Sequence, residues 1–152
     1  MEFTFKNIEN NRLIFKKFLE ELTVEQLNTI PEGFNNNIFW NIAHAMITSQ
    51  LLCYKLSGLP FTIDAAWVMS YKKGTKPEKD ITDADVKELK ELLFATLEQL
   101  KQDYSAGKFN AFEPYTVSTN NSTLNSVDDA LEFNEYHEGM HLGYILAQKK
   151  LV

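Results

Sequence analysis

The sequence predicts an all-α protein, a four-helix bundle with long crossover connections that forms one domain over residues 1–152. Apolar residues recur at helical spacing in four long segments, and capping residues or glycine bound each segment. Two connections, 59–81 and 107–125, are much longer than bundle loops usually are. Hydrophobic residues make up 44% and charged residues 24% of the chain, a globular balance for one core.

The first helix is predicted over residues 3–22, where the apolar residues fall on one side. These residues are Phe5, Ile8, Phe15, Leu19 and Leu22. Thr23 and Gln26 have the spacing of a capping box, which predicts a short helix near 24–29 before Pro31.

The second long helix is predicted over 36–57, because it follows a run of asparagines suited to capping and stops at Gly58. The third is predicted over 83–105, with Thr82 as its cap and Gly107 after its end. Its apolar stripe consists of Val86, Leu89, Leu93, Leu97 and Leu100.

The fourth long helix is predicted over 126–149, with Ser126 as its cap. The two long connections are rich in turn-forming and aromatic residues, so they must cross the bundle or cover part of it. Val117 and its threonine neighbours have strand propensity, but Pro114 and the asparagine-rich stretch favour a loop.

Charge and composition exclude several classes of partner. The formal net charge of -6 disfavours binding to nucleic acid or to an anionic membrane, both of which need a basic surface. The single cysteine excludes an intrachain disulfide, and no apolar run has the length of a membrane span. The first residues lack the pattern of a signal peptide, so we expect a cytoplasmic protein.

The three histidines are the candidate metal ligands. His137 and His141 lie four residues apart, which places both imidazoles on one face of the fourth long helix. His44 lies in an apolar part of the second helix, where an unpartnered imidazole would cost about 1–3 kcal/mol. If these two helices pack side by side, three imidazoles can bind one divalent ion and leave a coordination position open, as in catalytic sites. The alternative is that all three are ordinary core residues.

The segment from His137 to His141 also matches the metalloprotease pattern His-Glu-x-x-His, with Glu138 as the general base. No His, Asp or Glu follows His141, so a third ligand would have to come from upstream. Glu138 also lies about 100° around the helix from His137. A peptidase is therefore the less favoured interpretation.

Several other residues are candidates for orienting the metal ligands or contacting the substrate. Asn134 and Thr48 each lie one turn from a histidine, and Tyr144 is nearly in line with His137. Asn11 and Arg12 interrupt the apolar stripe of the first helix. Arg12 would suit an anionic substrate group, although a solvated arginine at the edge of the stripe is the simpler interpretation.

Cys53 is rejected as a ligand because it lies about 180° around the helix from the histidine nine residues earlier. Gly139 and Gly143 lie roughly opposite the histidine face, where they suggest close approach of another helix or a second subunit. Phe61 and Trp67 either line a mouth over the metal or cover the end of the bundle.

Segments 36–44 and 131–145 resemble the DinB-like family of helical-bundle proteins, and the order of the helices agrees along the chain. The resemblance implies that His44, His137 and His141 bind one divalent metal, commonly zinc, nickel or iron. It also implies a long crossover after the second helix and a homodimer.

Some members of the family are metal-dependent transferases or isomerases that use low-molecular-weight thiols. We therefore expect a metal-dependent enzyme acting on a small molecule, with thiol S-transferase chemistry favoured over that of a related hydrolase or isomerase. The alternatives are a metal-binding protein without catalysis and a helical interaction module.

Overall fold

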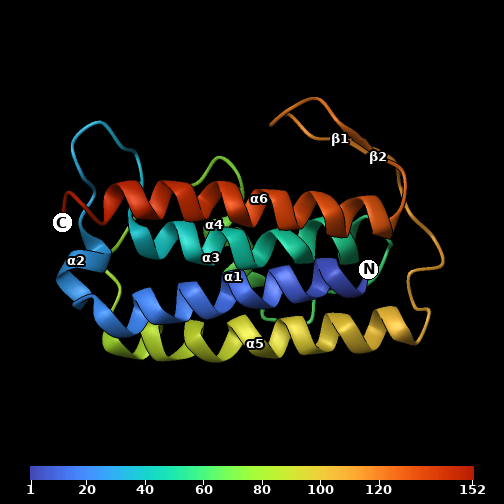
Figure 1. Cartoon of the computed structure of the whole chain (residues 1–152), viewed down its shortest axis with the longest axis horizontal. Helices are drawn as coiled ribbons and strands as arrows, with labels where there is room; N and C mark the ends of the chain where they lie inside the picture. The colour runs from blue at the N-terminus through green and yellow to red at the C-terminus, as the bar shows by residue number, and fades with distance from the viewer.

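A computed structural model describes residues 1–152 and shows a bundle of four long helices (Figure 1). These are α1 (Glu2–Glu21), α3 (Ile38–Ser49) with its π-helical continuation η1 (Gln50–Lys55), α5 (Asp83–Ser105) and α6 (Val127–Gln148). The all-α prediction is confirmed, and the helix ends lie within a few residues of the expected positions.

The capping residues found in the sequence act as caps. Thr23 and Gln26 form the predicted capping box of the short helix α2 (Val24–Asn28). Thr82 caps α5, and Ser126 accepts a hydrogen bond at the start of α6. The second long helix begins two residues later than expected, because the side chain of Asn37 accepts from the backbone N–H of Trp40.

The chain takes a crossover path through the bundle, as expected. α1 packs against both α5 and α6, and α3 packs against α6 and α5. In Figure 1, α3 and α5 run in the same direction, and so do α1 and α6. The connection between α3 and α5 must therefore return along the length of the bundle.

The two long connections contain more regular structure than the sequence indicated. The first includes α4 (Ala65–Tyr71), which Asp64 caps through its side chain. The second includes β1 (Tyr115–Thr116) and β2 (Thr123–Leu124), an antiparallel pair. The prediction of a loop there was wrong: Pro114 precedes the strand without interrupting it, and Asn121 adopts a φ of 60° in the turn.

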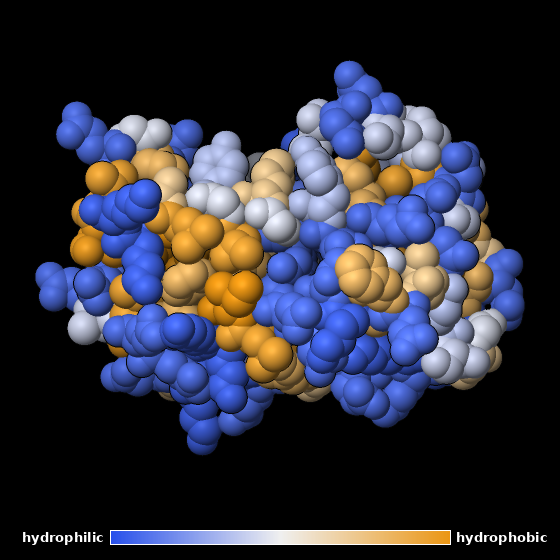
Figure 2. Space-filling model, in the orientation of Figure 1, coloured by the Kyte–Doolittle hydropathy of each residue, from blue (hydrophilic) through white to orange (hydrophobic).

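The core consists of two clusters of buried apolar side chains. The larger lies among α1, α3 and α5, and the smaller lies near η1 and the β1–β2 hairpin, where Val117 and Leu124 are buried. None of the helices is long and apolar enough to cross a membrane. The face shown in Figure 2 is largely hydrophilic, with an apolar area over the half of the bundle that holds the C-terminal end of α6.

Candidate metal centre

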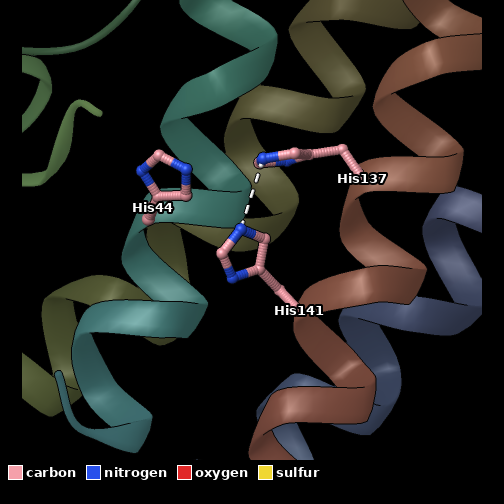
Figure 3. A group of neighbouring side chains, drawn as sticks. All are labelled: His44, His137 and His141. Atoms are coloured by element: carbon pink, nitrogen blue, oxygen red, sulfur yellow. Dashed lines mark hydrogen bonds between the residues drawn. The ribbon is translucent and has the colours of Figure 1, made fainter. Parts of the chain in front are cut away.

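Three histidines from two neighbouring helices converge inside the bundle (Figure 3). His44 comes from α3, and His137 and His141 come from α6. One nitrogen of each ring lies within 4.8 Å of the others. Only 6–7% of the surface of each residue is exposed. The predicted side-by-side packing of these helices is confirmed, and the histidines form one cluster.

Hydrogen bonds orient two of the rings. Nδ1 of His44 lies 2.6 Å from the backbone carbonyl oxygen of Tyr71, and Nδ1 of His141 lies 2.8 Å from Oδ1 of Asn41. A carbonyl oxygen only accepts, so each Nδ1 carries the proton and each Nε2 presents its lone pair. The Asn41 amide is fixed in this direction because its NH₂ group donates to Asn36, to the backbone of Asn37 and to Gln148.

The third ring completes a set of nitrogens suited to a metal. Nε2 of His137 lies 3.2 Å from Nε2 of His141. Two imidazole nitrogens bound to one tetrahedral zinc ion are separated by about 3.3 Å, given Zn–N bonds of about 2.0–2.1 Å. Nδ1 of His137 is buried without a hydrogen-bond partner, so the one hydrogen bond of this ring is the contact between its Nε2 and Nε2 of His141.

The environment keeps the three imidazoles neutral. Burial lowers the pKa of His44, and it lowers the pKa of His137 to about 3 and that of His141 to about 2. The neighbouring histidines add to the last two shifts. A metal ligand must be deprotonated, and these rings have lost their protons before any ion binds. Three neutral imidazoles fit a divalent ion with one open coordination position.

An aromatic side chain covers one face of the centre. The Trp40 ring stacks on the His44 ring, with centroids 4.6 Å apart and planes 8° from parallel. The Trp40 indole also donates to Thr75, which holds the stack in place. Sequence reasoning missed Trp40, Asn41 and Tyr71. The polar Asn41 in an otherwise apolar helix could have indicated its role from the sequence. The contact of the Tyr71 backbone carbonyl could not, because every residue has such a carbonyl.

A cavity of about 510 Å³ opens beside the three histidines. Its walls come from α3, η1 and α6, and from the segment 113–119, which contains β1. Besides the histidines it is lined by Thr48, Leu51, Leu52, Lys55, Leu56, Lys73, Glu113, Pro114, Tyr115, Val117, Ser118, Thr119, Phe133 and Met140. Its size suits a small organic ligand.

The predicted neighbours of the metal differ in whether they line the cavity. Thr48 lines it, and the Thr48 hydroxyl donates to the backbone carbonyl of His44. Asn134 is fully buried away from the cavity and donates to Glu138. Tyr144 is half exposed outside the cavity, with its ring 6.3 Å from that of His141.

The predictions for Arg12 were wrong. Arg12 is neither solvated nor directed into the cavity: it is 0% exposed and forms an ion pair of 3.2 Å with the equally buried Glu138. Its other donors bond to the backbone of Leu93 and to Thr96. The same ion pair removes Glu138 from the metal centre, so the arrangement of a His-Glu-x-x-His peptidase is absent.

The remaining candidates lie outside the centre. Cys53 is buried in the smaller core cluster, where burial raises its pKa to about 12, and its rejection as a ligand is confirmed. A Cβ added at Gly139 or Gly143 would meet nothing within 4 Å, so the expected approach of another helix of the same chain was wrong. Neither Phe61 nor Trp67 lines the cavity, and Trp67 packs against the larger core cluster.

Comparison with known proteins agrees with this architecture. The chain is similar to a conserved protein from Enterococcus faecalis of known crystal structure, with a TM-score of 0.65 at 15% identity over 99% of this chain and 95% of that one. No curated protein matches the sequence at a significant level. The family model of the DinB superfamily matches residues 7–145. The chain therefore belongs to the DinB superfamily.

Proposed function

We propose that the protein is a metal-dependent enzyme in which His44, His137 and His141 bind one divalent ion, namely zinc, nickel or iron. The observation that carries this proposal is the fixed direction of two imidazoles. Because Tyr71 and Asn41 accept the Nδ1 protons of two rings, their Nε2 lone pairs are left for a ligand at the inner end of the cavity.

A divalent ion in such a site lowers the pKa of a coordinated thiol or water, so that a nucleophile is present at neutral pH. The protein itself supplies three neutral nitrogens and a mostly apolar cavity. Glu113 is the only carboxylate that lines this cavity, and it is exposed, two residues before β1. The inner part of the cavity therefore offers no carboxylate as a general base for hydrolysis.

This scarcity of bases favours a low-molecular-weight thiol as co-substrate over water, and we propose a thiol S-transferase. In such a transfer the thiol loses its proton to solvent, its sulfur forms a bond to an electrophilic carbon, and the leaving group departs with its electron pair. A related hydrolase or isomerase is the alternative within the same site.

Elemental analysis of the untagged protein tests the metal site first. We expect about one divalent ion per chain, lost in His44→Ala and in His137→Ala and kept in the control Cys53→Ala. No bound metal after loading with zinc, nickel and iron would contradict the proposal and leave a helical interaction module.

The transferase is tested separately with monobromobimane, whose bromide is displaced by a thiol. The metal-loaded protein should accelerate the reaction of at least one of glutathione, cysteine, coenzyme A, bacillithiol and mycothiol, and His44→Ala should abolish the acceleration. Bound metal without acceleration for any thiol would contradict the transferase and favour a metal-binding protein without this activity.

A further inference from the structure

Two lysines line the cavity without a carboxylate partner. Lys55 is the last residue of η1, and Lys73 lies two residues beyond Tyr71. Both are exposed, and neither belongs to any of the ion pairs of the structure. The Lys73 ammonium donates only to the hydroxyl of Ser118 on the hairpin. Neither ammonium forms an ion pair, although the backbone of Glu113 bonds to Leu56, the residue beside Lys55.

The charge of the cavity is opposite to that of the whole chain. The chain has a formal net charge of -6, whereas the cavity is lined by two lysines, one glutamate and three neutral histidines. A divalent ion on the histidines would add two further positive charges. Two lysines against one glutamate give the lining a net charge of +1, and a positively charged cleft raises the local concentration of anions.

The lysines stand at different distances from the three histidines. His44, Thr48, Leu52 and Lys55 follow one another along one side of the same helix and all line the cavity. Lys55 lies eleven residues after His44, and because residues 50–55 are π-helical their axial separation is less than the roughly 16 Å of an α-helix at 1.5 Å per residue. Lys73 is closer, because it follows the tyrosine whose carbonyl oxygen contacts His44.

The wall between the histidines and Lys55 is largely apolar. Leu51 and Leu52 line it from η1 and Phe133 lines it from α6, and the hydroxyl of Thr48 donates to the backbone of His44. A ligand that reaches from the histidines to the lysines must therefore have an apolar middle part and an anionic end.

We propose that the cavity binds a small organic anion whose charged group is attracted by the two lysines that line it, Lys55 at the far end and Lys73 nearer the histidines, and whose apolar part lies against these walls. The inference rests on the proposed function, because it places the other end of the anion at the three-histidine centre. It adds the charge and the elongated shape of the substrate.

The test uses two thiols of equal chain length, 6-mercaptohexanoate and 6-mercaptohexanol, with the cobalt(II)-loaded protein. Binding is followed by the change in the visible absorption of cobalt. We expect the acid to bind about tenfold more tightly than the alcohol at low salt, since exposed ion pairs each contribute about threefold, and the preference to shrink as salt is added.

Variants identify the groups responsible. Lys55→Gln and Lys73→Gln should each reduce the preference for the acid about threefold, and the double variant should abolish it. Lys76→Gln, an exposed lysine that does not line the cavity, is the matched control. Ser118→Ala removes the hydrogen bond of Lys73 but keeps its charge, so the preference should remain. A preference undiminished in the double variant would come from the metal and would overturn the inference.

Calorimetry of the metal-free protein with the same two thiols separates the two proposals. A preference for the acid that the double lysine variant abolishes would uphold the anion site even if no metal binds. Equal affinity of the native protein for the acid and the alcohol, with and without metal, would overturn it.

Discussion

Nδ1 of His141 lies 2.8 Å from Oδ1 of Asn41, and this contact joins the three-histidine centre to a polar network at the start of α3. The Asn41 amide group donates to two neighbouring residues and to Gln148 near the end of α6. Asn41 therefore links the two helices that supply the three histidines, and it fixes which nitrogen of His141 faces the other two rings.

We expect Asn41→Ala to weaken zinc binding about 10- to 100-fold, because His141 loses the acceptor that sets its ring. The affinity is measured by competition with a zinc-binding dye. Asn28→Ala is the control, since the side chain of Asn28 makes two hydrogen bonds to the backbone of Ile81 and none to a histidine or to Asn41. An equal loss of affinity in both variants would mean that Asn41 acts through stability alone.

The buried ion pair between Arg12 and Glu138 predicts a large and non-additive effect on stability. Arg12→Met should lower the free energy of unfolding by about 3–5 kcal/mol, because it leaves a buried carboxylate without its counter-charge. The double variant Arg12→Met/Glu138→Leu should recover much of this loss. Urea unfolding measures all three proteins.

The control for this pair is an ion pair at the surface. Lys16 lies 3.7 Å from Glu20, and both side chains are more than 40% exposed. Lys16→Met should change the free energy of unfolding by less than about 1 kcal/mol. Comparable losses for Arg12→Met and Lys16→Met would show that burial does not govern the Arg12 pair.

The histidine cluster predicts how stability depends on pH. Burial holds the pKa of His137 at about 3 and that of His141 at about 2, below the ordinary value of 6.5. Below pH 6.5 these histidines therefore become protonated in the unfolded chain while they stay neutral in the folded metal-free protein. The free energy of unfolding falls as the pH falls.

Each histidine contributes up to about 1.4 kcal/mol per pH unit to this slope. We expect His137→Leu to reduce the slope of the free energy of unfolding against pH, between pH 6 and 5, by about 1.4 kcal/mol per pH unit, the equivalent of one proton. Urea unfolding at several pH values measures this slope. An unchanged slope would mean that His137 already accepts its proton in the folded state.

The exposed glycines of α6 predict that the helix can be stabilised. Neither Gly139 nor Gly143 has any atom within 4 Å of an added Cβ. Gly143→Ala should raise the free energy of unfolding by about 0.5–1 kcal/mol, because alanine loses less backbone entropy in a helix. Thermal unfolding measures the change. Gly58→Ala is the opposing control and should destabilise, since Gly58 has a φ of +69°.

The homodimer stays a prediction, and the same face offers a test of it. Gly143→Leu places a large side chain where the sequence suggested contact with a second subunit. Light scattering should show dissociation if the subunits meet there. A variant that remains fully dimeric would place the interface elsewhere.

The sequence was sufficient for the four long helices and for α2, but not for α4, and helical spacing alone paired two of the three clustered histidines. Caps at Thr23, Thr82 and Ser126 locate helix starts through local hydrogen bonds, which act over three residues. The spacing of His137 and His141 places both on one face, again a local property. His44 joined them because an imidazole in an apolar helix needs a partner, and the family resemblance then implied the same three residues.

Long-range contacts were the part that could not be predicted. Arginine is rarely fully buried, so the burial of Arg12 becomes evident only once Glu138, on another helix, is placed beside it. The role of Tyr71 depends on where the crossover connection passes. The hairpin depends on the burial of Val117 and Leu124 in a core cluster built largely from other elements.

The two acceptors that orient the imidazoles differ in how easily mutation can remove them. The acceptor for His44 is a main-chain oxygen, which every amino acid at position 71 would provide as long as the crossover keeps its path. The acceptor for His141 is the side chain of Asn41, which most single substitutions at that position would remove. Under random mutagenesis we expect many substitutions at position 41 to weaken metal binding through His141. Position 71 should tolerate many replacements without that loss.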